Sequence, residues 1–355
     1  MILHTAGSAT RRSIRHPVRP ALLAMALLAV LETAAHASIV IDATASGDGS
    51  TPATTVATST FSTTAPKELL LAFVSSDGVG DAVQVNSISG ASLTWVLVKR
   101  TNVQLGTAEI WRAFASTTLS NVTVTATLSQ SVDSSITVVS FKGVDPSGTN
   151  GSGAIGATTS ASSSAGAPSA SLVTTRDNSW VFGVGDDWDN PIARTVGSGQ
   201  TMVHEYMPPV GDTYWVQRTT SATATSGTTV TIDDTAPTGD RYNLTICEIL
   251  ADITAPTVSM TAPASGATVS GNAVTVSATA SDDAYVVGVQ FKLDGVNLGT
   301  EDTTSPYSIT WDTTTASNAS HALTAVARDA GGNRQMEPRQ TVCDHVTGRA
   351  AHLQR

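Results

Sequence analysis

Three aspartates within four positions are the residues of this chain most able to do chemistry. Asp186, Asp187 and Asp189 lie in the stretch GVGDDWDN, residues 183–190. Carboxylate oxygens on a loop are ligands that Ca²⁺ prefers, so these three side chains could bind a calcium ion if the chain turns at Gly185. The alternative is a solvated turn, in which Asp and Asn side chains hydrogen-bond to their own backbone. We predict no cofactor other than this candidate Ca²⁺.

Tryptophan rings near these carboxylates suggest a second chemistry, the binding of carbohydrate. Trp111, Trp188 and Trp215 could stack on sugar rings, and exposure of two of them on one sheet face would favour such a surface. Glycoside hydrolysis would also need two carboxylates across a cleft. Candidate partners for Asp189 are Glu109, Glu205 and Asp212, but nothing in the sequence shows that any of them converge. We therefore predict no enzymatic activity.

Histidine and cysteine usage excludes other enzyme classes. Only His204 and His321 lie within the predicted modules, one in each, so no His-rich zinc site can form. The sequence has no Gly-rich phosphate loop and no nucleophile-elbow serine. Cys247 lies in an apolar strand pattern and Cys343 in an irregular tail, so we interpret them as two unrelated thiols, the first buried.

The first 37 residues have the pattern of a secretory signal peptide. Arginines precede an apolar run at 21–31 that is too short to span a bilayer well, and Ala35-His36-Ala37 provides small residues for cleavage. The mature chain would begin at Ser38. An uncleaved membrane anchor is the alternative interpretation.

The charge of the mature chain excludes two classes of partner. Of 19 basic and 29 acidic residues, the leader removes four Arg and one Glu, which leaves 15 basic and 28 acidic residues and a net charge of −13. Such a chain is not attracted to nucleic acid or to anionic lipid. We expect a monomer without a membrane span, secreted or held at the cell surface.

Short apolar runs separated by turn residues predict an all-β protein. The run 68–76 is almost continuously apolar, as in a strand covered on both faces, whereas 121–128 alternates apolar and polar residues. So many strands favour a jelly-roll-like β-sandwich over residues 38–251. The Gly/Ser-rich segment 145–171 is either a flexible linker or a long loop with a weak edge strand, and we prefer the second.

A proline-bracketed segment at 251–263 marks the start of a second β-sandwich, over residues 252–335. Its phrases VTVSATASDD, VVGVQFKLDG and HALTAVARDAGGN resemble a bacterial immunoglobulin-like domain over about residues 254–333. The resemblance implies a spacer or adhesion module. Residues 336–355 depart from the family pattern, so we predict an irregular tail and an uncovered sheet edge. The first module resembles an uncharacterised β-sandwich of large bacterial secreted proteins.

Acidic residues also gather at predicted strand ends of the second module. Asp282, Asp283, Asp329 and Asn333 resemble positions that bind Ca²⁺ between tandem domains, and Asp252 lies in the preceding linker. Turn formation by these side chains is the alternative.

Together these features predict a secreted or cell-surface, non-enzymatic structural or adhesion protein. Its partners would be polysaccharides or other cell-surface components. The alternatives are a carbohydrate-binding protein and a fragment of a larger secreted enzyme.

Overall fold

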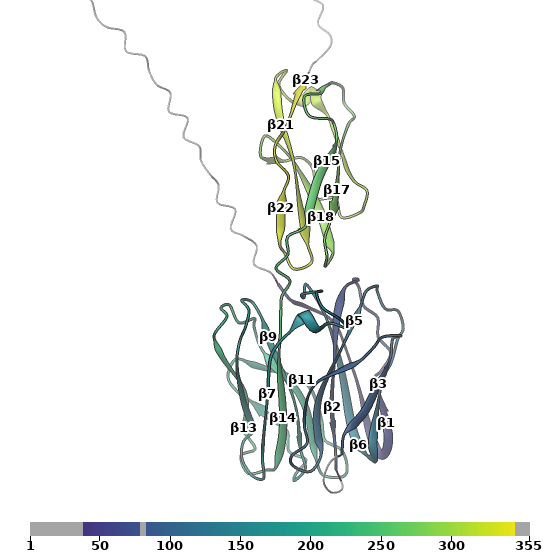
Figure 1. Ribbon diagram of the computed structural model, residues 1–355, viewed down its shortest axis with the longest axis vertical. Coiled ribbons are helices and arrows are strands. Elements are labelled where there is room, and N and C mark those ends of the chain that lie inside the picture. The colour runs from purple at the N-terminus through teal and green to yellow at the C-terminus, as the bar shows by residue number, and fades with distance from the viewer. Residues whose placement is uncertain (1–37, 79–82, 345–355) are drawn as a thin grey trace, which may run out of the picture. The chain divides into compact units, whose positions relative to one another are not determined.

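A computed structural model describes residues 38–78 and 83–344, which form two modules of almost wholly antiparallel strands (Figure 1). The predicted signal peptide at 1–37 lies outside the described residues, as do residues 345–355. Within the described ranges, no helix is long and apolar enough to cross a bilayer. The predicted all-β fold class is confirmed.

The first module runs from β1 to β14. Its strands are β1 (Val40–Ala57), β2 (Glu68–Ser76), β3 (Val85–Gly90), β4 (Val96–Thr101), β5 (Thr107–Ala115), β6 (Val124–Lys142), β7 (Ile155–Ser163), β8 (Ser169–Val173), β9 (Trp180–Asp187), β10 (Thr195–Val196), β11 (Gln200–Tyr206), β12 (Thr213–Thr219), β13 (Thr229–Ala236) and β14 (Tyr242–Ile249). A 3-10 turn, η1 (Ser152–Ala154), precedes β7. The segment 145–171 therefore carries β7 and the start of β8, both at sheet edges.

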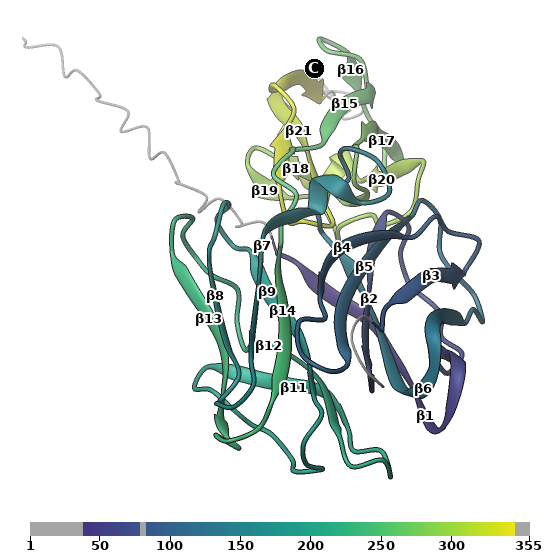
Figure 2. The ribbon, with the colours of Figure 1, turned by 60° about the horizontal axis from the view of Figure 1, so that its bottom comes forward.

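Two halves of the first module repeat one strand order. The larger sheet of the first half has the order β1-β6-β2-β5-β4, and that of the second half has the order β7-β14-β9-β12-β11. The smaller groupings also correspond, because β3 and the end of β1 flank the start of β6 as β10 and β8 flank β13. Figure 2 shows the purple-to-blue strands beside the teal-to-green ones. Residues 38–251, which we expected to form one jelly-roll-like sandwich, thus consist of two halves with the same arrangement of strands.

Strand β2 explains how the two halves pack. Leu69, Leu71 and Phe73 face the core that joins the two larger sheets, whereas Leu70 and its alternate neighbours face the core within the first half. Successive side chains of a strand point to opposite faces, so an almost continuous apolar run is needed where both faces are covered. Phe182 of β9 completes the shared core, with its ring centroid 5.7 Å from that of Phe73.

The second module contains the remaining strands. These are β15 (Thr257–Ala262), β16 (Thr268–Val269), β17 (Val274–Ser281), β18 (Val286–Leu293), β19 (Val296–Asn297), β20 (Tyr307–Trp311), β21 (Ser320–Asp329), β22 (Arg334–Met336) and β23 (Gln340–Asp344), with a 3-10 turn, η2 (Thr313–Thr315), after β20. One sheet has the order β15-β17-β20 and the other β16-β23-β21-β18-β19, with β22 also on β21. Trp311 and Phe291 lie in the core between them.

Within the predicted irregular tail, residues 340–344 form the regular strand β23. Strand β23 pairs antiparallel with β21 and parallel with β16, so it covers the sheet edge that the sequence left open. Val342 is fully buried in the core of the second module. One buried apolar residue between Thr341 and Cys343 is too short an alternation to be recognised in the sequence.

Candidate functional site

The three aspartates of GVGDDWDN occupy different environments at the end of β9. Asp186 and Asp187 are both buried but are neighbours in a strand, so their side chains point to opposite faces. Asp186 accepts a hydrogen bond from Asn243 Nδ2 at 3.2 Å. Asp189 lies beyond the strand and accepts from the backbone N–H of Arg241 at 2.6 Å.

Asp187 forms an ion pair with Arg194, and both side chains are completely buried. The other carboxylate oxygen of Asp187 accepts from the backbone N–H of Asp189 at 2.7 Å. The Arg194 guanidinium lies 4.5 Å from the centroid of the Trp215 ring. Burial raises the pKa of Asp187 to about 6, although Arg194 opposes that shift. Asp187 is therefore part of the internal structure of the second half of the first module.

The structure does not bring the three carboxylates together. A carboxylate oxygen from each would have to approach the same point to share an ion, and in the described part of the chain only one set of three acidic, His or Cys side chains comes within 4.8 Å of one another. That set does not include Asp186, Asp187 or Asp189. Calcium binding by these three residues stays a prediction without support from their geometry.

The three tryptophans are likewise separated by burial. Trp215 is 1% exposed and Trp111 is 9% exposed, with the Trp111 indole N–H donating to Glu109 Oε2 at 2.9 Å. Neither ring can stack on a sugar, so the expectation of a three-ring surface is corrected. Trp188 is 38% exposed and lies beside the guanidinium of Arg241, 5.2 Å from the ring centroid.

The carboxylates considered for glycoside hydrolysis accept hydrogen bonds from other groups of the chain. Glu109 is fully buried, pairs with Arg100 at 2.7 Å and accepts from the backbone N–H of Val85. Asp212 accepts from the Tyr214 hydroxyl at 2.8 Å, and burial raises the Asp212 pKa to about 7. Glu205 accepts from the backbone N–H of Arg194. These contacts support the fold and do not form an open acid–base pair.

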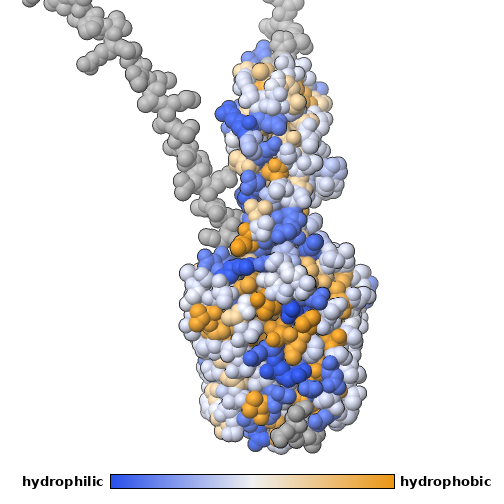
Figure 3. Space-filling model, in the orientation of Figure 1, coloured by the Kyte–Doolittle hydropathy of each residue, from blue (hydrophilic) through white to orange (hydrophobic). Residues whose placement is uncertain are grey.

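Exposed apolar side chains lie on two neighbouring loops at this end of the second half of the first module. The loop after β9 contributes Trp188 and Ile192, and the loop before β12 contributes Met207 and Val210; each is at least 38% exposed. The loops are joined through Thr213, whose hydroxyl accepts from the Ile192 N–H at 3.1 Å and donates to the carbonyl of Asn190 at 2.9 Å. We call these four side chains the loop patch. On the face of the first module that Figure 3 draws, blue and orange residues are intermixed.

The histidines and cysteines have structural environments. His204 Nε2 lies 3.0 Å from Asp48 Oδ1, and His321 Nδ1 lies 2.6 Å from Asp294 Oδ2. Cys247 is buried, Cys343 is exposed, and both are free thiols. The interpretation of two unrelated thiols is confirmed.

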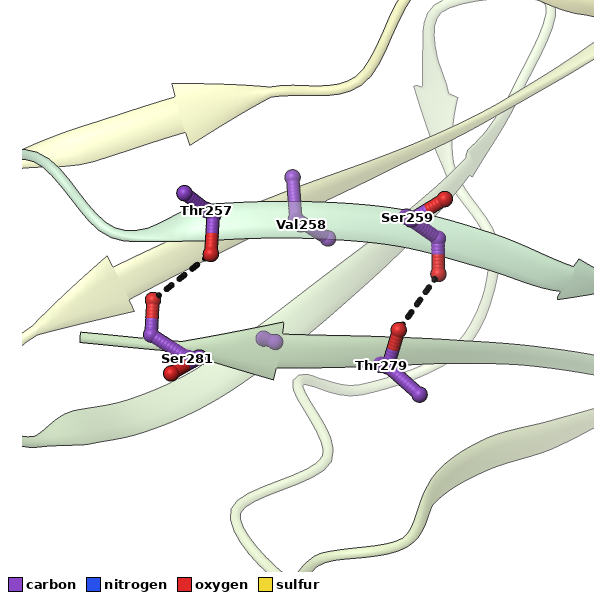
Figure 4. Close-up of a pocket in the computed structure, with 6 residues that line it drawn as sticks. Thr257, Val258, Ser259, Thr279 and Ser281 are labelled. Carbon is purple, nitrogen blue, oxygen red and sulfur yellow. Dashed lines mark hydrogen bonds between the residues drawn. The ribbon is translucent and has the colours of Figure 1, made fainter.

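A hollow of about 150 Å³ in the second module lies over strands β15 and β17 (Figure 4). Its lining is mainly hydroxyl groups that bond back to the paired strand, such as Thr257 Oγ1 to the Ser281 carbonyl at 3.0 Å. Acidic, basic and histidine side chains are not among the residues that line it. The hollow therefore offers no group for acid–base chemistry.

The acidic residues of the second module do converge. One carboxylate oxygen from each of Asp252, Asp282 and Asp283 lies within 4.8 Å of the other two. Asn333 Nδ2 donates to the Asp252 carbonyl at 3.0 Å and to Asp329 Oδ2 at 2.9 Å. We call Asp252, Asp282, Asp283 and Asp329 the acidic cluster.

Comparison with known proteins identifies one of the two modules. No curated protein matches the chain. Fibronectin(III)-like modules of CbhA from Clostridium thermocellum are similar at 26% identity over 25% of this chain and 94% of theirs, with a TM-score of 0.23. An endo-beta-1,4-mannanase from Thermotoga petrophila is similar at 18% identity over 26% of this chain and only 20% of its own length, with a TM-score of 0.23. Residues 256–325 match the family described as bacterial Ig domain, so the second module is a bacterial immunoglobulin-like domain.

Proposed function

We propose that this chain is a secreted or cell-surface adhesion protein without catalytic activity. Its second module belongs to a family typical of bacterial surface and secreted proteins, and the first 37 residues read as a secretory leader. The net charge of the mature chain keeps it away from nucleic acid and anionic lipid. Its expected partners are polysaccharides or other cell-surface components, which it contacts as a monomer.

The loop patch is the observation that carries an adhesive role beyond that of a spacer. Exposed apolar patches mark interaction surfaces on soluble proteins, and the two loops that carry these side chains are linked at Thr213. Trp188 is the largest of the four, and tryptophan is enriched among the residues that dominate binding energy. The paired strands β9 and β12 hold the two loops, so they give the loop patch a rigid support.

The partners of the buried carboxylates support the absence of catalytic activity. Glu109 and Asp187 are each paired with a buried or half-buried arginine, and Asp212 is bonded to a tyrosine hydroxyl. A general acid and a general base would need access to a substrate between them. Glu109, Asp187 and Asp212 instead bond to other residues of the chain.

Carbohydrate binding is the second candidate, favoured by the half-exposed Trp188 ring with Arg241 beside it. An indole face and a guanidinium together offer stacking and hydrogen-bond donors to a sugar. Only one of the three predicted rings can take this role, because Trp111 and Trp215 are buried.

Binding of residues 38–355 to whole bacterial cells and to insoluble polysaccharides tests the proposal. We expect retention on cells that falls at least severalfold in the variant Trp188→Ala. Tyr285→Ala is the matched control, because Tyr285 is an aromatic residue with 39% exposure in the other module. Retention on one purified polysaccharide would favour the second candidate. Reducing sugar released by the wild-type protein, or recovery of the native protein only inside cells, would overturn the proposal.

A further inference from the structure

In the described part of the chain, the acidic cluster brings several carboxylates together without a counter-ion. Asp252 precedes β15, Asp282 and Asp283 lie between β17 and β18, and Asp329 ends β21. Among the described residues, no lysine or arginine forms an ion pair with any of the four. The pKa of Asp252 is raised to about 7, mainly by burial and also by the charges of the neighbouring carboxylates. Four acidic groups are therefore held together without a positive partner.

Two carboxylate oxygens in this cluster also lack any hydrogen-bond donor. Asp252 is 1% exposed, and its Oδ2 is buried without a partner, whereas Oδ1 accepts from the backbone N–H of Thr254 at 2.9 Å. Asp282 Oδ1 is likewise buried and unpartnered, whereas Oδ2 accepts from Ala284 N–H at 2.9 Å. A buried carboxylate oxygen without a partner is unfavourable. The oxygens left over are those that a cation would use.

Hydrogen bonds of the chain hold the segments that carry the acidic cluster. The second oxygen of Asp282 also accepts from the Tyr285 N–H at 3.0 Å, which holds the β17–β18 loop in a tight turn. Asn333 ties the Asp252 backbone to Asp329, so the segment before β15 is fixed against the end of β21. The segments that bring Asp252, Asp282 and Asp283 within 4.8 Å of one another are thus held by the chain's own contacts.

We propose that the acidic cluster binds a single Ca²⁺ ion through carboxylate oxygens of Asp252, Asp282 and Asp283. All three ligand groups are hard oxygen donors, and neither His nor Cys contributes, which disfavours zinc and other transition metals. Ca²⁺ accepts flexible arrangements of 6–8 oxygens and completes its shell with water or carbonyl groups, whereas Mg²⁺ demands a near-ideal octahedron. Asp283 is exposed and leaves an open side for water.

Binding would join the segment that leads into β15 to the β17–β18 loop. The bound ion would neutralise charges that otherwise repel one another in the folded state, and it has no such site in the unfolded chain. Calcium therefore stabilises the second module by mass action. This inference is independent of the adhesive role, because it concerns the stability of the immunoglobulin-like domain and not its partners.

Isothermal titration calorimetry of chelator-treated residues 38–355 with CaCl₂ tests the site, with thermal unfolding in CaCl₂ and in EDTA as a second readout. We expect one ion per chain and an unfolding transition that shifts upward with Ca²⁺. Asp283→Asn should raise the Kd about tenfold or more, because ligand charge sets calcium affinity. Asp283 is exposed, so this variant should fold even if Asp252→Asn does not.

Two control variants separate this site from others. Asp302→Asn alters an aspartate of the same module that caps its own turn, accepting from Thr304 N–H at 3.0 Å, and should leave the Kd unchanged. Asp189→Asn alters the predicted site of the first module and should also leave it unchanged. No heat and no thermal shift for the wild-type protein would overturn the proposal. Binding that is lost in Asp189→Asn but kept in Asp283→Asn would overturn it as well.

Discussion

Removing the guanidinium of Arg194 should strongly destabilise the first module. In Arg194→Met, Asp187 would keep a carboxylate that is completely buried and has no counter-ion. Removal of one partner from a buried ion pair costs about 3–5 kcal/mol. Methionine fills much of the same volume and can still contact the Trp215 ring, so the lost charge should dominate the measured change.

The cost should depend on pH in a direction that identifies its cause. The pKa of Asp187 is already raised to about 6 by burial in the presence of Arg194, and it rises further without that cation. A carboxyl group with a raised pKa in the folded state binds its proton more tightly there than in the unfolded chain. Its contribution is favourable at low pH and is lost as pH rises. Arg194→Met should therefore lose more stability at pH 8 than at pH 5.

Urea unfolding at both pH values, followed by tryptophan fluorescence and circular dichroism, measures this effect. Transitions of the two modules have to be fitted separately, because a two-module chain need not unfold in one step. Arg241→Met is the matched control: its guanidinium is half-buried, 4.0 Å from Asp189, and the variant should cost less than about 1 kcal/mol.

A double variant, Asp187→Asn with Arg194→Met, completes the thermodynamic cycle. Asparagine retains the acceptor for the Asp189 N–H and removes the buried charge, so the double variant should recover much of the loss of Arg194→Met. The reasoning is refuted if Arg194→Met costs no more than Arg241→Met, or if its cost is the same at pH 5 and pH 8.

Three further predictions concern packing and protonation. Gly185→Ala should cost about 1–3 kcal/mol in urea unfolding, because a Cβ there would overlap a buried indole ring, whereas Gly239→Ala, with nothing within 4 Å, should be nearly neutral. Val342→Ala should destabilise the second module by about 1–3 kcal/mol in calorimetry; an unchanged transition would mean that β23 does not complete the core. Burial raises the pKa values of Asp212 and Asp234 to about 7, so the wild-type free energy of unfolding in EDTA should fall between pH 5 and pH 8, and a rise would contradict these assignments.

Strand identity could be predicted from the sequence, but the division of the first module could not. Strand β2 can be recognised in the sequence because it is almost continuously apolar, and it is so because each of its faces packs against a different core. Strands β1 and β6 are 18 and 19 residues long and pair along most of their length across several register shifts. The polar middle of β6 looks like a turn between two strands in sequence. The repeat of strand order is therefore hidden until the pairing is known.

The position of the candidate metal site could be predicted only in part, and the reason is the placement of cations. Asp187 ends the buried strand β9 and Asp252 comes shortly after the buried strand β14, so their positions look alike in the sequence. Arg194, seven residues after Asp187, folds back into the same core and neutralises it. No basic side chain does the same for Asp252 among the described residues, so its buried oxygen remains available. Whether a buried carboxylate pairs with a cation of the chain or lies unpaired beside other carboxylates depends on tertiary contacts, which the sequence does not show.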